Sequence, residues 1–224
     1  MVAYVMSVRP VTSPNAHLQE ANDLKKDILG IIMAGGKSSR LGQDKTRIVI
    51  ENRQTLLKKN YYLLNSLLKT CFVSCKTQSF NQDLPCIYDE SEYTSPLSGL
   101  ISSLNYAKKQ NFSAIFVIAC DLPFIQKSLL KKLYITYQEN KDNFILWTFY
   151  NPRLNAIEPL VSIYSCSSLN YLEKALAQKH FKLFDLIPLE QQKRIPYTKE
   201  EEQMFFNINT QNDLIKAKTI INNL

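Results

Sequence analysis

Short runs of consecutive apolar residues alternate with longer stretches of helical periodicity from residue 28 onwards. A short apolar run that stops at glycine, proline or a charged residue is typical of a strand buried inside a parallel sheet. This pattern predicts strands at residues 28–33, 47–50, 71–75, 85–88, 114–119, 144–149 and 158–164.

Between these runs, apolar side chains recur every three or four positions, which is the spacing of an amphipathic helix. One predicted helix begins at Ser95-Pro96, with serine as N-cap and proline in the first helical position. Another begins after Thr210, an N-cap followed three residues later by Asp213. Helices are predicted at residues 54–69, 96–109, 127–138, 168–178 and 211–221. The alternation predicts a single α/β domain with a three-layer, mainly parallel, doubly wound sheet.

The first 27 residues do not follow this pattern. They contain Pro10, Pro14 and several small polar residues, and their charges balance. Such a stretch has too little apolar surface to order itself. We therefore expect residues 1–27 to be a poorly ordered extension and residues 28–224 to form the folded domain.

The composition argues against several classes of protein. No apolar run approaches the ~18 residues that a membrane span requires. The mildly apolar start of the chain is cut short by Arg9-Pro10 and does not read as a secretory signal. The five cysteines have no paired spacing, which is typical of reduced thiols inside the cell. We expect a cytoplasmic protein without a membrane partner.

The formal charge of +7 predicts an anionic partner. Nucleotides, nucleic acid and acidic proteins all fit that charge. Lysines are spread along the chain without an arginine-rich arm or a basic stripe, so nucleic acid is not the expected partner. The chain has two histidines, His17 and His180, whereas catalytic triads and most zinc sites need histidine. The chemistry is therefore expected to use carboxylates, lysines, backbone amides or a hard metal ion.

A glycine-rich loop follows the first predicted strand. Residues 33–45 read Met-Ala-Gly-Gly-Lys-Ser-Ser-Arg-Leu-Gly-Gln-Asp-Lys. Gly35 and Gly36 allow backbone N–H groups to turn towards an anion, and Arg40 and Lys45 supply charge for phosphate oxygens. The run matches neither the Walker A nor the Rossmann glycine motif. A tight turn without a ligand is the alternative explanation of the glycine pair taken alone.

Two carboxylates lie just beyond predicted strands. Asp121 follows the strand at 114–119, where open α/β sheets bind their ligands, and a carboxylate there can hold Mg²⁺ against a phosphate. The alternative is that Asp121 caps the next helix. Asp89 follows the strand at 85–88, and the alternative to a ligand contact there is a solvated acid on a loop.

The run Ala-Gly-Gly-x-Ser-x-Arg-Leu-Gly-x-Asp-Lys at residues 34–45 resembles the signature of the molybdenum cofactor guanylyltransferases. Further matching motifs follow in the order of that family, and the resemblance covers residues 28–222. It departs from the family at Met33, where leucine is usual, and at Ser95, where glycine is usual. The further motifs are Tyr88-Asp89-Glu90, Ser95-Pro96-Leu97-Ser98-Gly99-Leu100, Cys120-Asp121-Leu122-Pro123, the segment 158–164, and Asn207-Ile208-Asn209-Thr210 with Asp213-Leu214.

The resemblance implies a Rossmann-like nucleotidyltransferase fold and gives roles to individual residues. Lys45, Arg40 and Asp121 would be catalytic, and Asp121 would ligate Mg²⁺. Cys75 is the alternative to Ser74 at its position, and Asn209 is either a second polar contact near the ion or part of a turn. Segment 158–164 would line the pterin side. Nucleotide binding would involve Met33, Ala34, Gly35, Gly36, Lys45, Ser74, Asp89 and Asp121.

The implied reaction transfers GMP from GTP to the terminal phosphate of molybdenum-molybdopterin and releases pyrophosphate. The implied partners are GTP, molybdopterin and, among proteins, molybdoenzymes or other proteins of cofactor biosynthesis. Three alternatives stay open. They are a cytidylyl or sugar-phosphate transferase on the same fold, a homologue that binds nucleotide without turnover, and a basic RNA-binding protein.

Overall fold

The computed structural model describes residues 28–34, 41, 44–51, 54–76, 83–89 and 91–223. The predictions made for residues 1–27 and for Gly35, Gly36 and Arg40 lie outside these residues. No helix within the described part of the chain is long and apolar enough to span a bilayer.

A seven-stranded sheet forms the centre of the molecule, in the order β5-β4-β1-β6-β8-β7-β9. Within this sheet β8 runs antiparallel to its neighbours β6 and β7, and every other neighbouring pair is parallel. The predicted mainly parallel sheet is thereby confirmed. The strands are β1 (Ile28–Met33), β4 (Cys71–Cys75), β5 (Cys86–Tyr88), β6 (Ala114–Ala119), β7 (Leu146–Asn151), β8 (Ala156–Ser165) and β9 (Gln192–Pro196).

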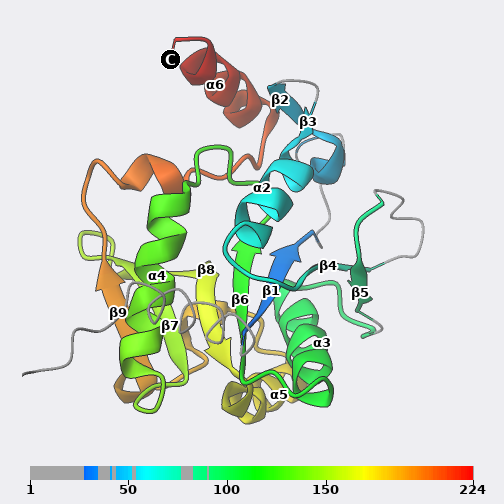
Figure 1. Ribbon diagram of the computed structural model, residues 1–224, viewed down its shortest axis with the longest axis vertical. Coiled ribbons are helices and arrows are strands. Elements are labelled where there is room, and N and C mark those ends of the chain that lie inside the picture. Colours follow the sequence, from blue (N-terminus) through cyan, green and yellow to red (C-terminus); the bar gives the residue numbers. More distant parts are fainter. Residues whose placement is uncertain are drawn as a thin grey trace, which may run out of the picture.

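Helices cover both faces of this sheet (Figure 1). On one face lie α2 (Leu56–Asn65) and α4 (Lys127–Asn140), and on the other lie α3 (Pro96–Lys109) and α5 (Leu169–Ala177). Successive strand residues enter opposite layers of the core: Phe116 packs on the side of α2 and α4, whereas Ile115 packs on the side of α3 and α5. Such two-sided burial is why these strands are continuously apolar. The three layers are as predicted.

A small third cluster lies beyond the end of the sheet. The antiparallel pair β2 (Val49–Glu51) and β3 (Gln54–Thr55) lies beside α6 (Gln211–Asn222), at the top of Figure 1. Apolar contacts join the two regions and place the 3-10 helix η1 (Lys45–Arg47) near the segment before α6. The cluster consists of Leu41, Ile48, Leu56, Ile208, Leu214 and Ala217. The remaining 3-10 helices are η2 (Cys166–Ser168), η3 (Leu183–Asp185), η4 (Leu189–Gln191) and η5 (Glu202–Phe205).

Side-chain caps start the helices at the predicted places. Ser95 caps α3 and Thr210 caps α6, and each completes a reciprocal capping box with the residue three positions later. The helix predicted at 54–69 is wrong at both ends. Thr55 is extended and caps α2 by accepting from Lys58 N–H, and the helix ends at Asn65 so that the chain can turn into β4.

The strand β9 was not predicted. It reads Gln-Lys-Arg-Ile-Pro and lies at the edge of the sheet beside β7. An edge strand is buried over less of its length than a central one, so it lacks a continuous apolar run. Charged residues and a terminal proline are typical of such an edge.

Candidate active site

The carboxyl ends of four parallel strands, β5, β4, β1 and β6, meet at one edge of the sheet. Met33 ends β1 and lies in register with Ser74 of β4 and with Ala119 of β6. Asp89 follows β5, and Asp121 lies two residues beyond β6. Open α/β sheets bind ligands at this edge. The topology therefore brings predicted site residues together from distant parts of the chain.

Lys45 joins Asp121 to Asn209. Its Nζ lies 2.7 Å from Asp121 Oδ2 and donates a second hydrogen bond to Asn209 Oδ1, also at 2.7 Å. The Lys45 and Asp121 side chains are 21% and 13% exposed. Partial burial strengthens the attraction relative to an open surface. Apolar packing brings Lys45 and Asn209 together, because Leu41 and Ile48 contact the α6 segment.

The position of Lys45 is set locally by Asp44. Asp44 Oδ1 accepts from the backbone N–H of Thr46 at 2.9 Å and from the Thr46 hydroxyl at 2.7 Å, which caps η1. The aspartate of the Asp-Lys pair therefore orients the short helix that carries the lysine. At the other end of the glycine loop, Ala34 N–H extends the sheet by donating to Ser74 O at 2.9 Å.

The two carboxylate oxygens of Asp121 differ in their hydrogen bonding. Asp121 Oδ1 is buried and has no hydrogen-bond partner among the residues that the structure describes. Buried polar atoms nearly always have a partner, so this oxygen is the candidate ligand atom of the site. The alternative that Asp121 caps α4 is wrong, because Gln126 is the N-cap and that helix has no side-chain cap bond.

The oxygens of Asp121 and Asn209 fit the ligand preference of Mg²⁺. This ion takes oxygen ligands and is usually held by one or two carboxylates together with substrate phosphates. Within the described ranges, no three His, Cys, Asp or Glu side chains gather as a metal-binding group. A carboxylate oxygen and an amide oxygen fit an ion that is shared with a substrate phosphate.

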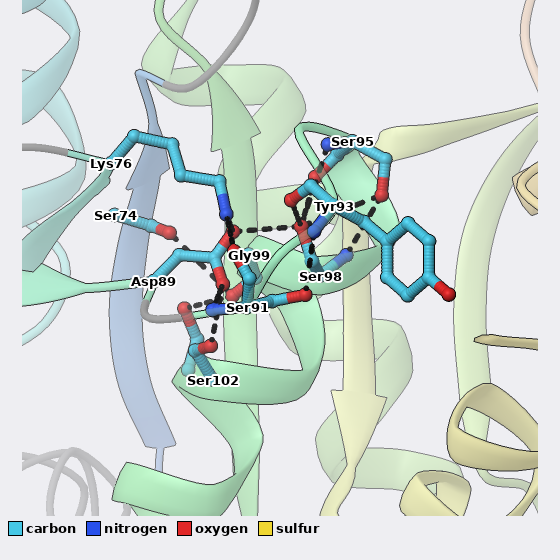
Figure 2. A network of polar contacts seen from close by, with 10 residues as sticks. Ser74, Lys76, Asp89, Ser91, Tyr93, Ser95, Ser98, Gly99 and Ser102 are labelled. Carbon is cyan, nitrogen blue, oxygen red and sulfur yellow. Dashed lines mark hydrogen bonds and ion pairs between the residues drawn. The ribbon is translucent and has the colours of Figure 1, made fainter. Parts of the chain in front are cut away.

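Asp89 has a fully bonded environment (Figure 2). It is 5% exposed. Its Oδ2 accepts from Ser98 Oγ at 2.7 Å and lies 3.1 Å from Lys76 Nζ. Its Oδ1 accepts from Ser102 Oγ at 3.1 Å and from Ser91 N–H at 3.0 Å. The alternative of a solvated loop acid is wrong, and Asp89 ties the first turns of α3 to the end of β5. Its contact with nucleotide stays a prediction.

Gly99 lets α3 approach the ends of β1 and β4. A Cβ at this position would lie 2.7 Å from Met33 Cε and 3.0 Å from Ser74 Oγ. Both Met33 and Ser74 are buried, and a small hollow is lined by Met33, Ser74, Cys75, Lys76, Asp89, Thr94, Ser95 and Gly99. Ser74 and Cys75 both reach this hollow, so both remain candidates for the nucleoside contact.

A cavity of about 200 Å³ is lined by residues on both sides of Asp121. Glu158 Oε1 accepts from the Tyr197 hydroxyl at 2.8 Å, and that hydroxyl accepts from Asn151 Nδ2 at 3.0 Å. Burial raises the pKa of the Glu158 carboxyl, and the hydrogen bond from Tyr197 offsets part of that rise. The lining consists of Ala119, Leu122, Glu158, Pro159, Leu160, Val161 and Asn207.

Two buried cysteines, Cys71 and Cys120, are unsuited to act as nucleophiles. None of the five cysteines forms a disulfide, and Cys71, Cys75 and Cys120 are buried. Burial raises the pKa of the Cys71 thiol to about 12 and also raises the pKa of Cys120, next to Asp121. Because the thiolate is the reactive form, these groups are inert at neutral pH.

Two residues near the site were not singled out from the sequence. Lys76 pairs with Asp89, and Asn60 donates to the turn that carries Asp121. Asn60 lies three residues after Leu57 and four before Leu64, on the apolar face of α2. A polar residue on a buried helical face was the available signal. Lys76 follows a strand in an ordinary loop context and had no such signal.

A mainly parallel sheet with a lysine, a carboxylate and an amide at its carboxyl edge has the architecture of a Rossmann-like nucleotidyltransferase. The family of MobA-like NTP transferase domains matches residues 30–193. The chain belongs to this family.

Similar proteins extend along most of the chain. A Pelotomaculum thermopropionicum protein named "Probable molybdenum cofactor guanylyltransferase" is 29% identical over 205 residues, which cover 87% of this chain and 93% of that protein. A "Molybdenum cofactor guanylyltransferase" of Campylobacter jejuni is 27% identical and covers 84% of this chain and 94% of its own. The solved structure of molybdopterin-guanine dinucleotide biosynthesis protein A from Archaeoglobus fulgidus has a TM-score of 0.68 at 24% identity, covering 88% and 100% of the two chains.

Proposed function

We propose that this protein transfers GMP from GTP to the terminal phosphate of molybdenum-molybdopterin, forming the guanine dinucleotide cofactor and pyrophosphate. The observation that carries the proposal is the cluster of Lys45, Asp121 and Asn209 at the carboxyl edge of the sheet. The names of relatives at 27–29% identity over most of the chain support guanine and molybdopterin as the substrates.

The reaction forms one P–O bond and breaks another. An oxygen of the acceptor's terminal phosphate bonds to the α-phosphorus of GTP, and the bond from that phosphorus to the bridging oxygen breaks. Pyrophosphate leaves with the electron pair. The acceptor phosphate is already ionised at neutral pH, so no general base is required. Catalysis then depends on alignment of the two phosphates and on positive charge around them.

We assign part of that charge to Lys45. Its ammonium group lies between a carboxylate oxygen and an amide oxygen, which hold it at the edge of the sheet. A lysine held in this way needs little reorganisation to face the triphosphate. Arg40 and the backbone amides of Gly35 and Gly36 are the further donors that we assign to the phosphates.

Asp121 Oδ1 is the atom that we assign to Mg²⁺, with Asn209 as a second oxygen nearby. When bound, the ion supplies charge neutralisation at the phosphates. Asp121 can serve Lys45 and the ion together because only one of its two oxygens is bonded in the described part of the chain. Oδ2 lies at the ammonium group and Oδ1 has no partner within the described residues.

The nucleoside side of the site lies towards β4 and β5. We assign Met33, Ala34, Ser74 and Asp89 to GTP, because Met33, Ser74 and Asp89 line one small hollow next to Ala34. Asp89 is bonded on both oxygens and fixes α3 beneath this hollow. Asp89 therefore supports nucleotide binding by holding α3 in place, in addition to any direct contact with the nucleotide.

The acceptor side lies towards β8. We assign the cavity of about 200 Å³ to the pterin, because it opens beside Asp121 and on the far side of β6 from the nucleoside hollow. Glu158 brings hydrogen-bonding capacity into a mostly apolar lining. Its carboxyl group is oriented by Tyr197, which is in turn held by Asn151.

The test incubates the whole protein with Mg²⁺, molybdenum-molybdopterin and each of the four nucleoside triphosphates in separate reactions. We expect pyrophosphate and a dinucleotide product only in the reaction that contains GTP. A dinucleotide product in the CTP reaction would show that the protein transfers a cytidylyl group instead of a guanylyl group. Transfer from a nucleotide to a sugar phosphate but not to the pterin would overturn the acceptor. Binding of GTP without pyrophosphate release would show a nucleotide-binding homologue without turnover.

A further inference from the structure

One side chain donates hydrogen bonds to the backbone of the turn that carries Asp121. Asn60 Nδ2 donates to the carbonyl oxygens of Ala119, Cys120 and Leu122 at 3.2, 3.3 and 3.2 Å. These carbonyls lie on both sides of Asp121 in the sequence. A buried turn needs a partner for each carbonyl, and here a single amide group serves three of them.

The two remaining carbonyls of residues 119–123 are bonded as well. Asp121 O accepts from Ile208 N–H at 3.0 Å, and Pro123 O accepts from Lys59 Nζ at 2.9 Å. Lys59 is the neighbour of Asn60 on α2, so one helix supplies the donors for four of these five consecutive carbonyls. The direction of the Asp121 side chain depends on this backbone, and the backbone is tied to α2.

Asn60 is not explained by packing. It is 0% exposed, and its Oδ1 has no hydrogen-bond partner within the described ranges. An apolar side chain of the same size would fill the position without burying an unpaired acceptor, which is unfavourable. The benefit of asparagine at this position therefore comes from the two N–H donors that face the turn.

The same helix is joined to the segment of Lys45. Leu56 N–H, at the start of α2, donates to Ile48 O at 2.8 Å, directly after η1. Contacts between α2 and η1 extend this connection. Lys45 and Asp121, which form an ion pair, are therefore both anchored to α2, one near its first residue and the other through Asn60.

We propose that Asn60 is a positioning residue that sets the Asp121 carboxylate against Lys45 and the phosphates. The proposal rests on the proposed function only for the role of Asp121, since the hydrogen bonds of Asn60 are independent of any substrate. Loss of the amide donors should loosen the turn and misplace the carboxylate while leaving the nucleoside hollow unchanged.

The test compares the whole wild-type protein with Asn60→Leu, which is similar in volume but has no donor. We expect kcat for guanylyl transfer to fall about tenfold while KM for GTP changes less than about twofold, because a misplaced carboxylate affects the phosphates rather than the nucleoside. Independently of activity, hydrogen exchange at the Cys120 and Ile208 amides should become faster. Those amides donate to Met33 O and to Asp121 O, at 3.1 and 3.0 Å.

Two further variants separate positioning from general destabilisation. Asn60→Ser keeps one hydroxyl donor and should show smaller changes of both kinds in the same direction. Ser168→Ala is the matched control, because Ser168 is 0% exposed and its hydroxyl donates to Ser165 O at 2.7 Å, on η2 away from the site. The control should leave kcat and the exchange of Cys120 and Ile208 unchanged.

The two proposals fail in different ways. If the wild-type protein transfers no nucleotide, the proposed function fails, while faster exchange at Cys120 and Ile208 in Asn60→Leu still supports the anchoring of the turn. If exchange at these amides is the same in Asn60→Leu as in Ser168→Ala, Asn60 does not hold the turn. If exchange quickens and kcat stays at the wild-type value, the anchoring does not serve Asp121.

Discussion

Asp89 and Asp121 follow parallel strands at the same edge of one sheet, but their hydrogen bonding in the described part of the chain differs: both oxygens of Asp89 are bonded, and only one oxygen of Asp121 is. Asp89 is 5% exposed, and each of its oxygens accepts from two donors among Lys76, Ser91, Ser98 and Ser102. Asp121 is partly exposed, has Lys45 at one oxygen and has no partner for the other within the described residues. The same residue type therefore holds secondary structure together in one place and, in the function that we propose, binds a metal ion in the other.

The contrast comes from what lies next to each strand end. After β5 the chain enters α3, and two hydroxyl groups in the first turns of that helix, those of Ser98 and Ser102, donate to Asp89. After β6 the turn is bonded through its backbone carbonyls, so the Asp121 side chain is not required to hold the turn. A carboxylate becomes available for chemistry when other groups supply the structural bonds around it.

The strongest test of the contrast is Asp121→Asn. We expect a folded protein whose guanylyl transfer falls by roughly 10²-fold or more, about 2.7 kcal/mol of transition-state stabilisation, because the negative charge that faces Mg²⁺ is lost. Activity is measured across a Mg²⁺ titration, with circular dichroism to check folding. Asp142→Asn, at an exposed position, is the control. A folded Asp121→Asn protein with normal turnover and unchanged Mg²⁺ dependence would remove Asp121 from the metal site.

Lys45→Ala is expected to have the next largest effect. Loss of one cation facing the triphosphate should weaken GTP binding about tenfold or more, as expected for a hydrogen bond to a charged group worth ~1.5 kcal/mol. Turnover should fall as well. Calorimetric titration of GTP measures the affinity, with Lys131→Ala on the exposed side of α4 as control. Equal affinity and equal turnover in Lys45→Ala and wild type would place the lysine outside the site.

Asp89→Asn should act mainly on stability. It leaves the partly buried Lys76 without its carboxylate and weakens the bonds to α3. We expect a loss of about 2 kcal/mol, or roughly 4–8 °C in the thermal midpoint for a domain of this size. Differential scanning calorimetry gives the midpoint, and a GTP titration is run beside it. An unchanged midpoint with a large loss of GTP affinity would reverse the contrast and make Asp89 chiefly a ligand contact.

Glu158→Gln should have the smallest effect of the four substitutions, and the effect should be on stability. Glu158 is intermediate between Asp89 and Asp121, since it has one bonded oxygen in a cavity. Burial raises the pKa of the folded-state carboxyl above its ordinary 4.5. The folded protein therefore binds more protons than the unfolded chain in the range above pH 4.5, and this group's contribution to stability is lost as pH rises through the folded-state pKa. Urea unfolding at pH 4 and pH 7 should show that Glu158→Gln gains stability relative to wild type at the higher pH. A difference between the two proteins that does not vary with pH would contradict the pKa rise.

The sequence was sufficient for the boundaries of three central strands and one helix, whereas the strands predicted at 144–149 and 158–164 lie at 146–151 and 156–165. The strands at 28–33, 71–75 and 114–119 are continuous apolar runs, and the helix at 96–109 carries its own start signal at Ser95-Pro96, so their boundaries match the structure. β9 escaped prediction because an edge strand has no two-sided apolar pattern. The end of α2 escaped because the tertiary turn into β4 overrides an apolar periodicity that continues to Leu68.

For the site, the sequence indicated where carboxylates and a lysine stand along the chain, and the structure adds which of them meet. Lys45 and Asn209 are 164 positions apart, and their contact depends on packing in the small cluster beside α6. The opposite environments of Asp89 and Asp121 depend on side-chain directions that residue spacing does not determine. Lys76 and Asn60 were not predicted as site residues for the same reason, because their importance depends on the groups that they contact.

The separate cluster beside α6 has a consequence for how the protein is made. A growing chain that has reached residue 200 contains every strand of the sheet, together with Lys45 and Asp121, and can bury most of its core. It still lacks Asn209 and the apolar residues of α6 that pack on Leu41 and Ile48. Since chains fold while synthesis proceeds, the sheet can form on the ribosome before Lys45 receives its second oxygen partner. The contact between Lys45 and Asn209 therefore forms after the strands of the sheet have been synthesised, once residues 208–217 pack beside Leu41 and Ile48.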